Sequence, residues 1–172
     1  MVDIPSFTTD RLLLRPLREK DLDAYAAIMA DPEVTRYLGD GQPLSRVDAW
    51  RQMALFLGHW QLRGYGHWAV EERGSGALAG RVGLFLPEGW PGFELGWTLG
   101  RAFWGRGYAT EAARAALRYA FSELGREHVI SLIHPDNRAS IRVAERLGES
   151  REGETEFYGR TVLVYGIHRG AS

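Results

Sequence analysis

Residues 103–110 read FWGRGYAT and lead directly into a helical pattern over residues 111–124. Gly105 and Gly107 permit a sharp turn of the backbone, and the start of the following helix offers unpaired N–H groups and the positive end of a helix dipole. These features favour an anion such as a phosphate at this place. A tight strand-to-helix turn without a ligand explains the glycine pair equally well, so the stretch alone leaves both interpretations open.

The stretch differs from two familiar phosphate-binding motifs. No Gly-Lys-Ser or Gly-Lys-Thr follows it, as a Walker motif requires. The strands expected before it form hairpins, whereas a Rossmann fold is built from successive βαβ units. An anion site here therefore belongs to another fold class.

The helical pattern after the stretch has the clearest periodicity in the chain. Small side chains dominate its apolar face, which allows close packing on a sheet. The face consists of Ala109, Ala112, Ala113, Ala116, Leu117, Ala120, Phe121 and Leu124. We predict a helix over these residues that packs on a sheet and has Gly125 at its C′ position.

Strand patterns lie on both sides of this helix. They fall at residues 11–17, 67–72, 78–86, 93–99, 128–133, 151–158 and 161–168. Gly80 and Gly83 indicate a bulge or a close backbone approach inside one of these strands. A tight turn at residues 73–76 joins the strands at 67–72 and 78–86, which we expect to form an antiparallel pair. The whole pattern predicts one α/β domain with a mixed, largely antiparallel sheet.

Three further helices are expected, each after a capping residue. Asp21 and Ser45 are the predicted N-caps of the first two helices, and Asn137 or Asp136 caps the third. The apolar face of the second helix is predicted to contain Trp50, Met53, Ala54, Leu57 and Trp60. Core packing is the favoured role of its aromatic residues, ahead of a substrate pocket.

The composition is that of an ordinary globular domain. The 172 residues carry a formal net charge of -1, so no overall field attracts nucleic acid or an anionic membrane. The absence of cysteine excludes a disulfide framework, thiolate catalysis and cysteine-ligated metal. Residues 1–5 lack the pattern of a secretion signal, and no segment stays apolar long enough to span a bilayer. We expect a cytoplasmic protein without nucleic-acid or membrane partners.

The five histidines are expected on separate elements, with no two at the spacing of metal ligands on a helix. They are His59, His67, His128, His134 and His168. We therefore predict no metal site. A homodimer is compatible with the sequence, because an exposed aromatic residue such as Trp90 would suit an interface.

Together, four stretches make the chain resemble the GNAT N-acetyltransferases, and within them the branch similar to the ribosomal-protein N-terminal acetyltransferases RimJ and RimL. They are TDRLLLR at 9–15, LAGRVGL at 78–84, ELGW at 94–97 leading into WGRGYATEA at 104–112, and PDNRASI at 135–141 ending at Leu147–Gly148. They follow the family's order and cover nearly the whole chain. The resemblance implies a GNAT fold, an α/β fold of the α+β type. Its mixed, mostly antiparallel sheet has about six to seven strands, flanked by about four helices, in a single domain over residues 1–172.

The resemblance also implies that acetyl-CoA is the co-substrate. The backbone of residues 97–99 would pair with the pantetheine arm like an added strand, and the amides of residues 105–110 would hold the pyrophosphate. Asn137 would reach the pantetheine or serve only as a helix cap. The implied cofactor-binding residues are Trp97, Thr98, Leu99, Gly105, Arg106, Gly107, Tyr108, Ala109, Thr110 and Asn137. Arg138 and Arg142 are candidates for the adenosine phosphate, although solvated helix charges explain them as well.

The implied reaction is direct transfer of the acetyl group to a primary amine, either a protein N-terminus or a small-molecule amine. Glu94 is the candidate base, with a surface carboxylate as its alternative role, and Glu156 is the second choice. In many family members a tyrosine protonates the departing CoA thiolate, but this chain has Ala144 at that position. Ser140 is therefore the candidate acid, and protonation by solvent is the alternative. Glu149 stands where phenylalanine is common, which predicts less apolar burial at that corner.

Two other functions remain open at this point. A non-catalytic CoA-binding or regulatory module could use the same fold, and a nucleotide-phosphate binder could use the glycine turn differently. The acceptor would be selected by the loops at residues 34–43 and 87–92, which carry no diagnostic chemistry.

Overall fold

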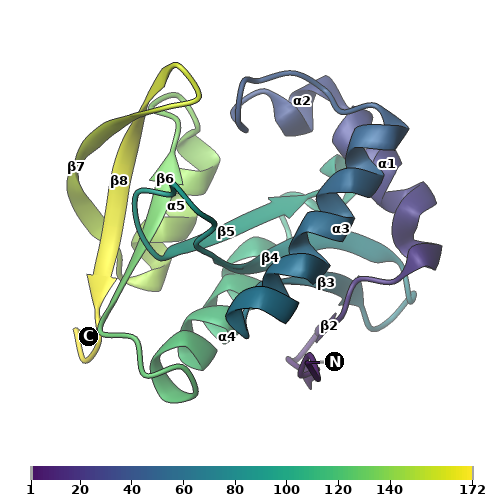
Figure 1. Cartoon of the computed structure of the whole chain (residues 1–172), viewed down its shortest axis with the longest axis horizontal. Coiled ribbons are helices and arrows are strands. Elements are labelled where there is room, and N and C mark those ends of the chain that lie inside the picture. The colour runs from purple at the N-terminus through teal and green to yellow at the C-terminus, as the bar shows by residue number, and fades with distance from the viewer. Residues whose placement is uncertain (1, 172) are drawn as a thin grey trace.

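The computed structural model describes residues 2–171, so the end residues of the predicted domain, Met1 and Ser172, lie outside the described range. Within that range the chain forms one sheet of eight strands and five α-helices (Figure 1). The strands are β1 (Phe7–Thr8), β2 (Leu12–Arg15), β3 (His67–Glu72), β4 (Leu78–Phe85), β5 (Glu94–Leu99), β6 (His128–Ile133), β7 (Ser150–Phe157) and β8 (Arg160–His168). The helices are α1 (Leu22–Ala30), α2 (Pro32–Thr35), α3 (Arg46–Arg63), α4 (Tyr108–Ser122) and α5 (Arg138–Leu147).

The strands follow the order β1-β2-β3-β4-β5-β6-β8-β7 across the sheet. All neighbours are antiparallel except β5 and β6, which confirms the predicted mixed, mostly antiparallel sheet. The described chain has one strand and one helix more than the upper predicted numbers. The extra strand is β1, which pairs with β2, and the extra helix is α2, which begins at Pro32 with Asp31 as its N-cap.

Helices cover both faces of the sheet, with α1 and α3 on one face and α4 and α5 on the other (Figure 1). The predicted alanine face of α4 is buried against the strands, and Ala112, Ala113 and Ala116 have no exposed surface. The helix ends at Ser122, with Glu123 as its C-cap. Gly125 was predicted at the C′ position and lies one residue beyond it. Among the described residues, no helix combines the length and the apolar character that a membrane span requires.

Two of the predicted helix details are correct only in part, since Asp21 does occupy the N-cap position of α1 and Met53 and Trp60 do lie on the buried face of α3. Asp21 does not cap α1 with its side chain, because both of its carboxylate oxygens accept hydrogen bonds from the buried Arg15 guanidinium, each at 2.8 Å. On α3, Trp50 is 47% exposed and Ala54 is also exposed, because the helix turns a different face to the sheet. The buried face consists of Ala49, Met53, Phe56, His59 and Trp60. Apolar residues occur on several sides of α3, so periodicity alone did not identify this face.

The other predicted caps are confirmed. Ser45 accepts the N–H of Asp48 at 3.1 Å, and Asn137 accepts the N–H of Ser140 at 3.2 Å. Gly148 ends α5 in the left-handed conformation, as its place in the sequence predicted.

The sheet opens between β5 and β6. These strands share one register pair, Glu94 with Ile130, and the hydroxyl of Ser131 donates to the carbonyl of Leu95 at 2.8 Å. No residue of β6 pairs with residues 97–99 in the described chain, although β4 still pairs with them on the other side. The end of β5 therefore has an edge that no strand covers, next to the start of α4, although the Leu99 carbonyl accepts the Trp104 indole N–H at 2.9 Å.

Candidate active site

Two pockets on opposite sides of the β5–β6 opening meet through a small space between them. The loop pocket, about 660 Å³, lies between the start of α4, the end of β5 and α5, and its lining includes Trp97, Leu99, Gly105, Gly107, Thr110, Asn137 and Arg142. The aromatic pocket, about 560 Å³, has a lining that includes Phe56, His67, Arg81, Phe85, Trp90, Glu94 and Phe157. The connecting space, about 90 Å³, is shared by Glu94 from the aromatic pocket and by Trp97, Asn137 and Ser140 from the loop pocket.

The glycine turn stands at one wall of the loop pocket. Gly105 and Gly107 have φ angles of 74° and 78°, which L-residues with side chains rarely adopt. Gly107 is the N-cap of α4 and has no side chain to cap it. The N–H groups of Tyr108, Ala109 and Thr110 belong to the first turn, where intrahelical partners are missing, so they are available to an anion.

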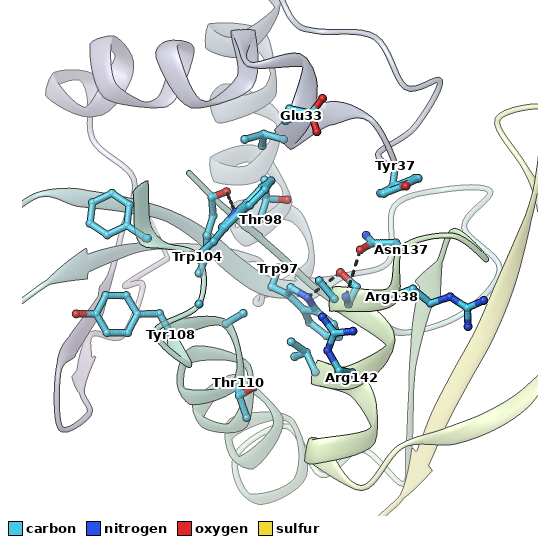
Figure 2. A pocket seen from close by; sticks show the side chains of 18 of the residues that line it. Glu33, Tyr37, Trp97, Thr98, Trp104, Tyr108, Thr110, Asn137, Arg138 and Arg142 are labelled. Carbon is cyan, nitrogen blue, oxygen red and sulfur yellow. Dashed lines mark hydrogen bonds between the residues drawn. The ribbon is translucent and has the colours of Figure 1, made fainter. Parts of the chain in front are cut away.

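Thr110 adds a second sign of an unfilled polar site. Its hydroxyl oxygen is buried and has no hydrogen-bond partner among the described residues, and the same holds for the hydroxyl of Thr98. Both threonines line the loop pocket (Figure 2). Buried hydroxyls without partners are uncommon, so these two groups fit a ligand that supplies polar atoms.

The start of α4 is held by residues that sequence reasoning did not single out for this purpose. Glu111 accepts hydrogen bonds from the Thr9 hydroxyl at 2.6 Å, from the Arg11 N–H at 2.8 Å and from the Arg11 guanidinium at 2.7 Å. Although partial burial raises the pKa of Glu111, these bonds lower it overall. The stretch at residues 9–15 thus fixes the glycine turn in place.

Arg106 is the one predicted cofactor-binding residue that does not line the loop pocket. Its guanidinium pairs with Glu72 at 3.0 Å, and the Tyr108 hydroxyl donates to the same carboxylate at 2.6 Å. The side chain of Arg106 is therefore directed to the end of β3. Its backbone remains part of the turn.

One side of α5 supplies positive charge to the loop pocket. Arg138, Arg142 and Arg146 all line it, and Figure 2 shows Arg142 next to Trp97 while the side chain of Arg138 extends away from it. In the described part of the chain, none of the three has an ion-pair partner. Arg146 was missed at the sequence level, although the spacing of four residues from Arg142 places both on one side of a helix.

Ser140 and Asn137 lie where the loop pocket meets the connecting space. The indole N–H of Trp97 donates to the Ser140 hydroxyl oxygen at 3.3 Å. An indole N–H can only donate, so the hydrogen of the Ser140 hydroxyl stays available for another acceptor. Asn137 caps α5 through its carbonyl oxygen, which leaves its amide NH₂ free to donate.

Glu94 lies at the opposite end of the connecting space, on β5. Its carboxylate accepts a hydrogen bond from the Trp90 indole N–H. Burial raises the pKa of Glu94 to about 7, and the Trp90 hydrogen bond and the Arg81 charge limit the rise. Glu94 is therefore divided between its ionised and protonated forms near neutral pH. Glu156, the second choice from sequence, bonds the Thr161 hydroxyl and lines none of the three described spaces.

Trp90 belongs to the aromatic pocket, which contradicts its predicted place on an exposed surface. It contacts Phe85 and Phe157 in edge-on geometry, with ring centroids 5.1 and 4.7 Å apart. The residues around 87–92 and 34–43 do line this pocket, as expected for loops that select the acceptor. The aromatic character of the pocket was not predicted, because its rings come from strands and helices far apart in the sequence.

Glu149 is buried, in place of the phenylalanine that is common in the family. It is 4% exposed, and Ser131 bonds it at 3.0 Å while also donating to the Leu95 carbonyl. A hydroxyl has one hydrogen, so a neutral Glu149 that donates to Ser131 completes this chain of bonds. Burial raises the pKa of Glu149 to about 8, opposed by Ser131 and reinforced by the charges of Glu152 and Glu94. Glu149 is therefore mostly protonated at neutral pH.

The sheet brings two histidines together that the sequence places forty residues apart. His128 and His168 are register partners on β6 and β8, and the His128 Nε2 atom lies 2.9 Å from Glu152 on β7. In residues 2–171 these three form the one group with the ligand number and spacing that a metal ion needs. Helical spacing is not the relevant criterion for such a group, because it forms across strands. The absence of a metal site stays a prediction.

A family model described as an acetyltransferase (GNAT) domain matches residues 11–149. Two relatives from Bacillus subtilis match most of the chain. YkkB, an uncharacterised protein, is 32% identical over 91% of this chain and 92% of its own length. YoaA, an uncharacterised N-acetyltransferase, is 30% identical over 90% of this chain and 88% of its own length.

Solved structures match as well. The crystal structure of an acetyltransferase from Agrobacterium tumefaciens is 35% identical and superposes with a TM-score of 0.87, covering 97% of this chain and 96% of that one. The structure of RimL, a ribosomal alpha-N-protein acetyltransferase in complex with coenzyme A, has a TM-score of 0.79 over 95% of this chain and 97% of that one. At 20% identity, the RimL likeness concerns the fold alone.

Proposed function

The chain belongs to the GNAT acetyltransferase family, and we propose that it moves the acetyl group of acetyl-CoA directly to a primary amine bound in the aromatic pocket. The observation that carries this proposal is the connecting space, which Glu94 lines from one pocket and Ser140 from the other. An amine beside Glu94 and a thioester beside Ser140 meet in this space. The amine is either a protein N-terminus or part of a small molecule.

Acetyl-CoA fits the loop pocket by the chemistry of its lining. The uncovered edge of β5 at Trp97 and Leu99 accepts the pantetheine amides as an added strand, with the amide of Asn137 as a further donor. The first-turn N–H groups of α4 and the Thr110 hydroxyl bind the pyrophosphate. The guanidinium groups of α5 face the adenosine phosphate. Arg106 acts through its backbone in this arrangement, because its side chain pairs with Glu72.

The reaction needs no covalent enzyme intermediate. The neutral amine attacks the thioester carbonyl carbon, a nitrogen–carbon bond forms, and the carbon–sulfur bond breaks. Glu94 takes the proton that the amine loses, and the Ser140 hydroxyl gives a proton to the departing CoA sulfur. A water molecule then gives a proton to Ser140, and the hydroxide so formed takes the amine proton from Glu94, which returns both residues to their starting states.

The environments of the two residues support these roles. A general base works best when its pKa lies near the working pH, and burial brings the pKa of Glu94 to about 7. Ser140 accepts from Trp97, so its own hydrogen is free for the sulfur. A thiolate with a pKa of about 8.5 is a tolerable leaving group, so the demand on Ser140 is modest.

The four sequence stretches that resemble RimJ and RimL support membership of that branch. They span residues 9–148, and in the described range one continuous sheet runs from β1 to β8, with apolar clusters packed on it. Residues 1–172 therefore form one transferase domain under this proposal, acting in the cytoplasm.

The test combines binding with turnover. Titration of the purified protein with acetyl-CoA should give saturable binding and a rise in melting temperature. Incubation with acetyl-CoA and a panel of primary amines should then release free CoA thiol in the presence of at least one amine. Binding of acetyl-CoA without thiol release from any amine would contradict the proposed reaction, and absence of binding would contradict the whole assignment.

A further inference from the structure

Arg81 brings a positive charge into the aromatic pocket, where it limits the rise that burial causes in the pKa of Glu94, without forming an ion pair with it. The residue lies on β4, lines both the aromatic pocket and the connecting space, and is partly buried. In the described part of the chain it forms no ion pair. Arginines removed from water are normally paired with a carboxylate of the protein, so an anionic group of a ligand is the partner to consider for Arg81.

The guanidinium of Arg81 is held in place by neutral groups. Its Nε–H donates to the Tyr25 hydroxyl at 3.1 Å, and Tyr25 in turn donates to Gln52. Its Nη1 atom donates to His67 Nδ1 at 3.3 Å, and its plane lies over the Phe56 ring, 4.9 Å from the centroid. Burial and the Arg81 charge both lower the pKa of His67 well below its ordinary value, so His67 is neutral and can accept.

These contacts leave donors of Arg81 unused. A guanidinium carries five N–H groups, and the Nη2 group of Arg81 has no partner among residues 2–171. The fork of an arginine binds the two oxygens of a carboxylate in a fixed geometry. A rigid cation with free donors, open to a cavity, is a prepared site for an anionic group of a ligand.

Arg81 and Glu94 border the same small space, so one small molecule in it can contact both. Both residues line the connecting space of about 90 Å³. Gly96, which lines both the aromatic pocket and the connecting space, places no side chain between them. A Cβ atom at Gly96 would have Glu94 Oε1 and His67 Cε1 as its nearest neighbours, each 3.7 Å away, so a small group can lie there.

We propose that the acceptor is an amine with a carboxylate only a few bonds away, as in a free amino acid, and that Arg81 binds this carboxylate while Glu94 receives the amine proton. The inference rests on the proposed acetyl transfer and narrows its acceptor. A protein N-terminus has such a carboxylate only when one of its first residues is acidic. The rings of Phe85, Trp90 and Phe157 then surround an apolar side chain of the acceptor.

The test compares acceptors with and without the carboxylate, and kcat/KM is referred to the neutral amine because amidation also lowers the pKa of the α-amine. L-phenylalanine and L-phenylalaninamide form one pair, and the N-terminal dipeptide amides Ala-Asp and Ala-Asn form the other, which separates a free carboxylate from an acidic peptide. We expect the native protein to prefer L-phenylalanine over its amide by about tenfold or more in kcat/KM, measured by release of CoA thiol. A preference for the Ala-Asp peptide with no reaction of L-phenylalanine would overturn the free amino acid as the acceptor.

Variants of Arg81 locate the preference. Arg81→Gln should lower kcat/KM for the carboxylated acceptor about tenfold or more and change it about threefold or less for the amide, while Arg81→Lys should keep part of the preference. Arg118→Gln is the matched control, because Arg118 is exposed on α4 and lines neither pocket. Circular dichroism and melting temperature establish that each variant is folded.

The outcomes distinguish this inference from the proposed function. If Arg81→Gln slows both acceptors equally and moves the acid limb of the pH profile, Arg81 acts only on Glu94, and carboxylate binding is wrong. If the native protein prefers the uncharged amide, the inference is also wrong, although acetyl transfer stands. If no amine of a wider panel releases CoA thiol, the proposed function itself fails.

Discussion

The loop pocket and the aromatic pocket are built in different ways. The loop pocket takes the largest share of its wall from one stretch, residues 97–110, with the rest from residues 33–38 and 136–146, and its anion donors are backbone N–H groups of α4. The aromatic pocket takes side chains from α3 and from strands β3 to β8, which meet only because the sheet has the register it has. The first is a property of a local segment, and the second is a property of the whole fold.

Because of this difference, the two pockets should respond differently to amino-acid substitutions. A site made of backbone groups depends on conformation, so it should be sensitive to the glycines and insensitive to most nearby side chains. A site made of side chains should change its acceptor with single substitutions while binding of acetyl-CoA stays the same. The following variants test this separation, from the largest expected effect to the smallest.

Glu94→Gln should have the largest effect. Removal of a general base typically costs about 10²–10⁴-fold in rate, so kcat/KM for the amine should fall by that factor. The Kd for acetyl-CoA, measured by calorimetry, should stay within about twofold because Glu94 lies outside the loop pocket. A comparable loss of acetyl-CoA affinity would show that the two pockets are not independent.

The pH profile provides a second readout for Glu94. The base must be ionised to act, so kcat/KM should rise with pH through an apparent pKa of about 7, the value to which burial raises this carboxyl. In Glu94→Gln this limb should disappear, and the titration of the acceptor amine itself should be all that is left. An unchanged limb in the variant would assign it to another group.

Gly107→Ala should act on the other pocket. With φ at 78° an added side chain is strained by about 1–2 kcal/mol, and release of that strain would turn the first N–H groups of α4 away. We expect the Kd for acetyl-CoA to rise about tenfold. Gly74→Ala is the matched control, since Gly74 has no positive φ and open space around it. An unchanged Kd in Gly107→Ala would argue against the turn as the pyrophosphate site.

Ser140→Ala should lower kcat by about tenfold, with little change in either Kd. The loss is modest because solvent can protonate a thiolate with a pKa of about 8.5. Pre-steady-state measurement of CoA release separates this step from amine attack. Full activity in the variant would show that water, and not Ser140, protonates the CoA thiolate. Ser122→Ala, on the exposed end of α4, is the control for loss of a hydroxyl from a helix.

Arg142→Gln should give the smallest effect. An exposed ion pair contributes at most about 1 kcal/mol, so the Kd for CoA should rise about fivefold or less. The loss should vanish for CoA without its 3′-phosphate and shrink at high salt. Arg118→Gln, on the exposed surface of α4, is the matched control. An equal loss for both forms of CoA would place Arg142 elsewhere than at the adenosine phosphate.

Local signals in the sequence predicted helices, caps and the glycine turn, whereas the family resemblance supplied the GNAT fold and the cofactor-binding residues. The alanine face of α4, the caps at Ser45 and Asn137 and the glycine turn all follow from neighbouring residues, and the structure has them as predicted. Asp21 shows where this reasoning fails. Its local pattern is that of a cap, but a buried arginine from β2 offers two stronger bonds, and nothing near Asp21 in the sequence indicates that contact.

The aromatic pocket could not be predicted in the same way. Arg81, His67 and Tyr25 come together through the register of β3 and β4 and the packing of α1, which alternating patterns do not determine. Trp90 has the sequence context of an exposed loop residue, yet its indole bonds Glu94. Glu94 itself was identified through the family resemblance, because its burial depends on residues from four other elements.

The single pair that joins β5 and β6 has a mechanical consequence. The strands β6, β8 and β7 are attached to the rest of the sheet at Glu94 and Ile130 and are otherwise held by side chains. If the pantetheine arm adds to the edge of β5, the cofactor connects strands β1–β5 with strands β6–β8. Amide hydrogens of β5 and β6 should then exchange with deuterium more slowly when acetyl-CoA is bound, and those of β2 and β3 should not change.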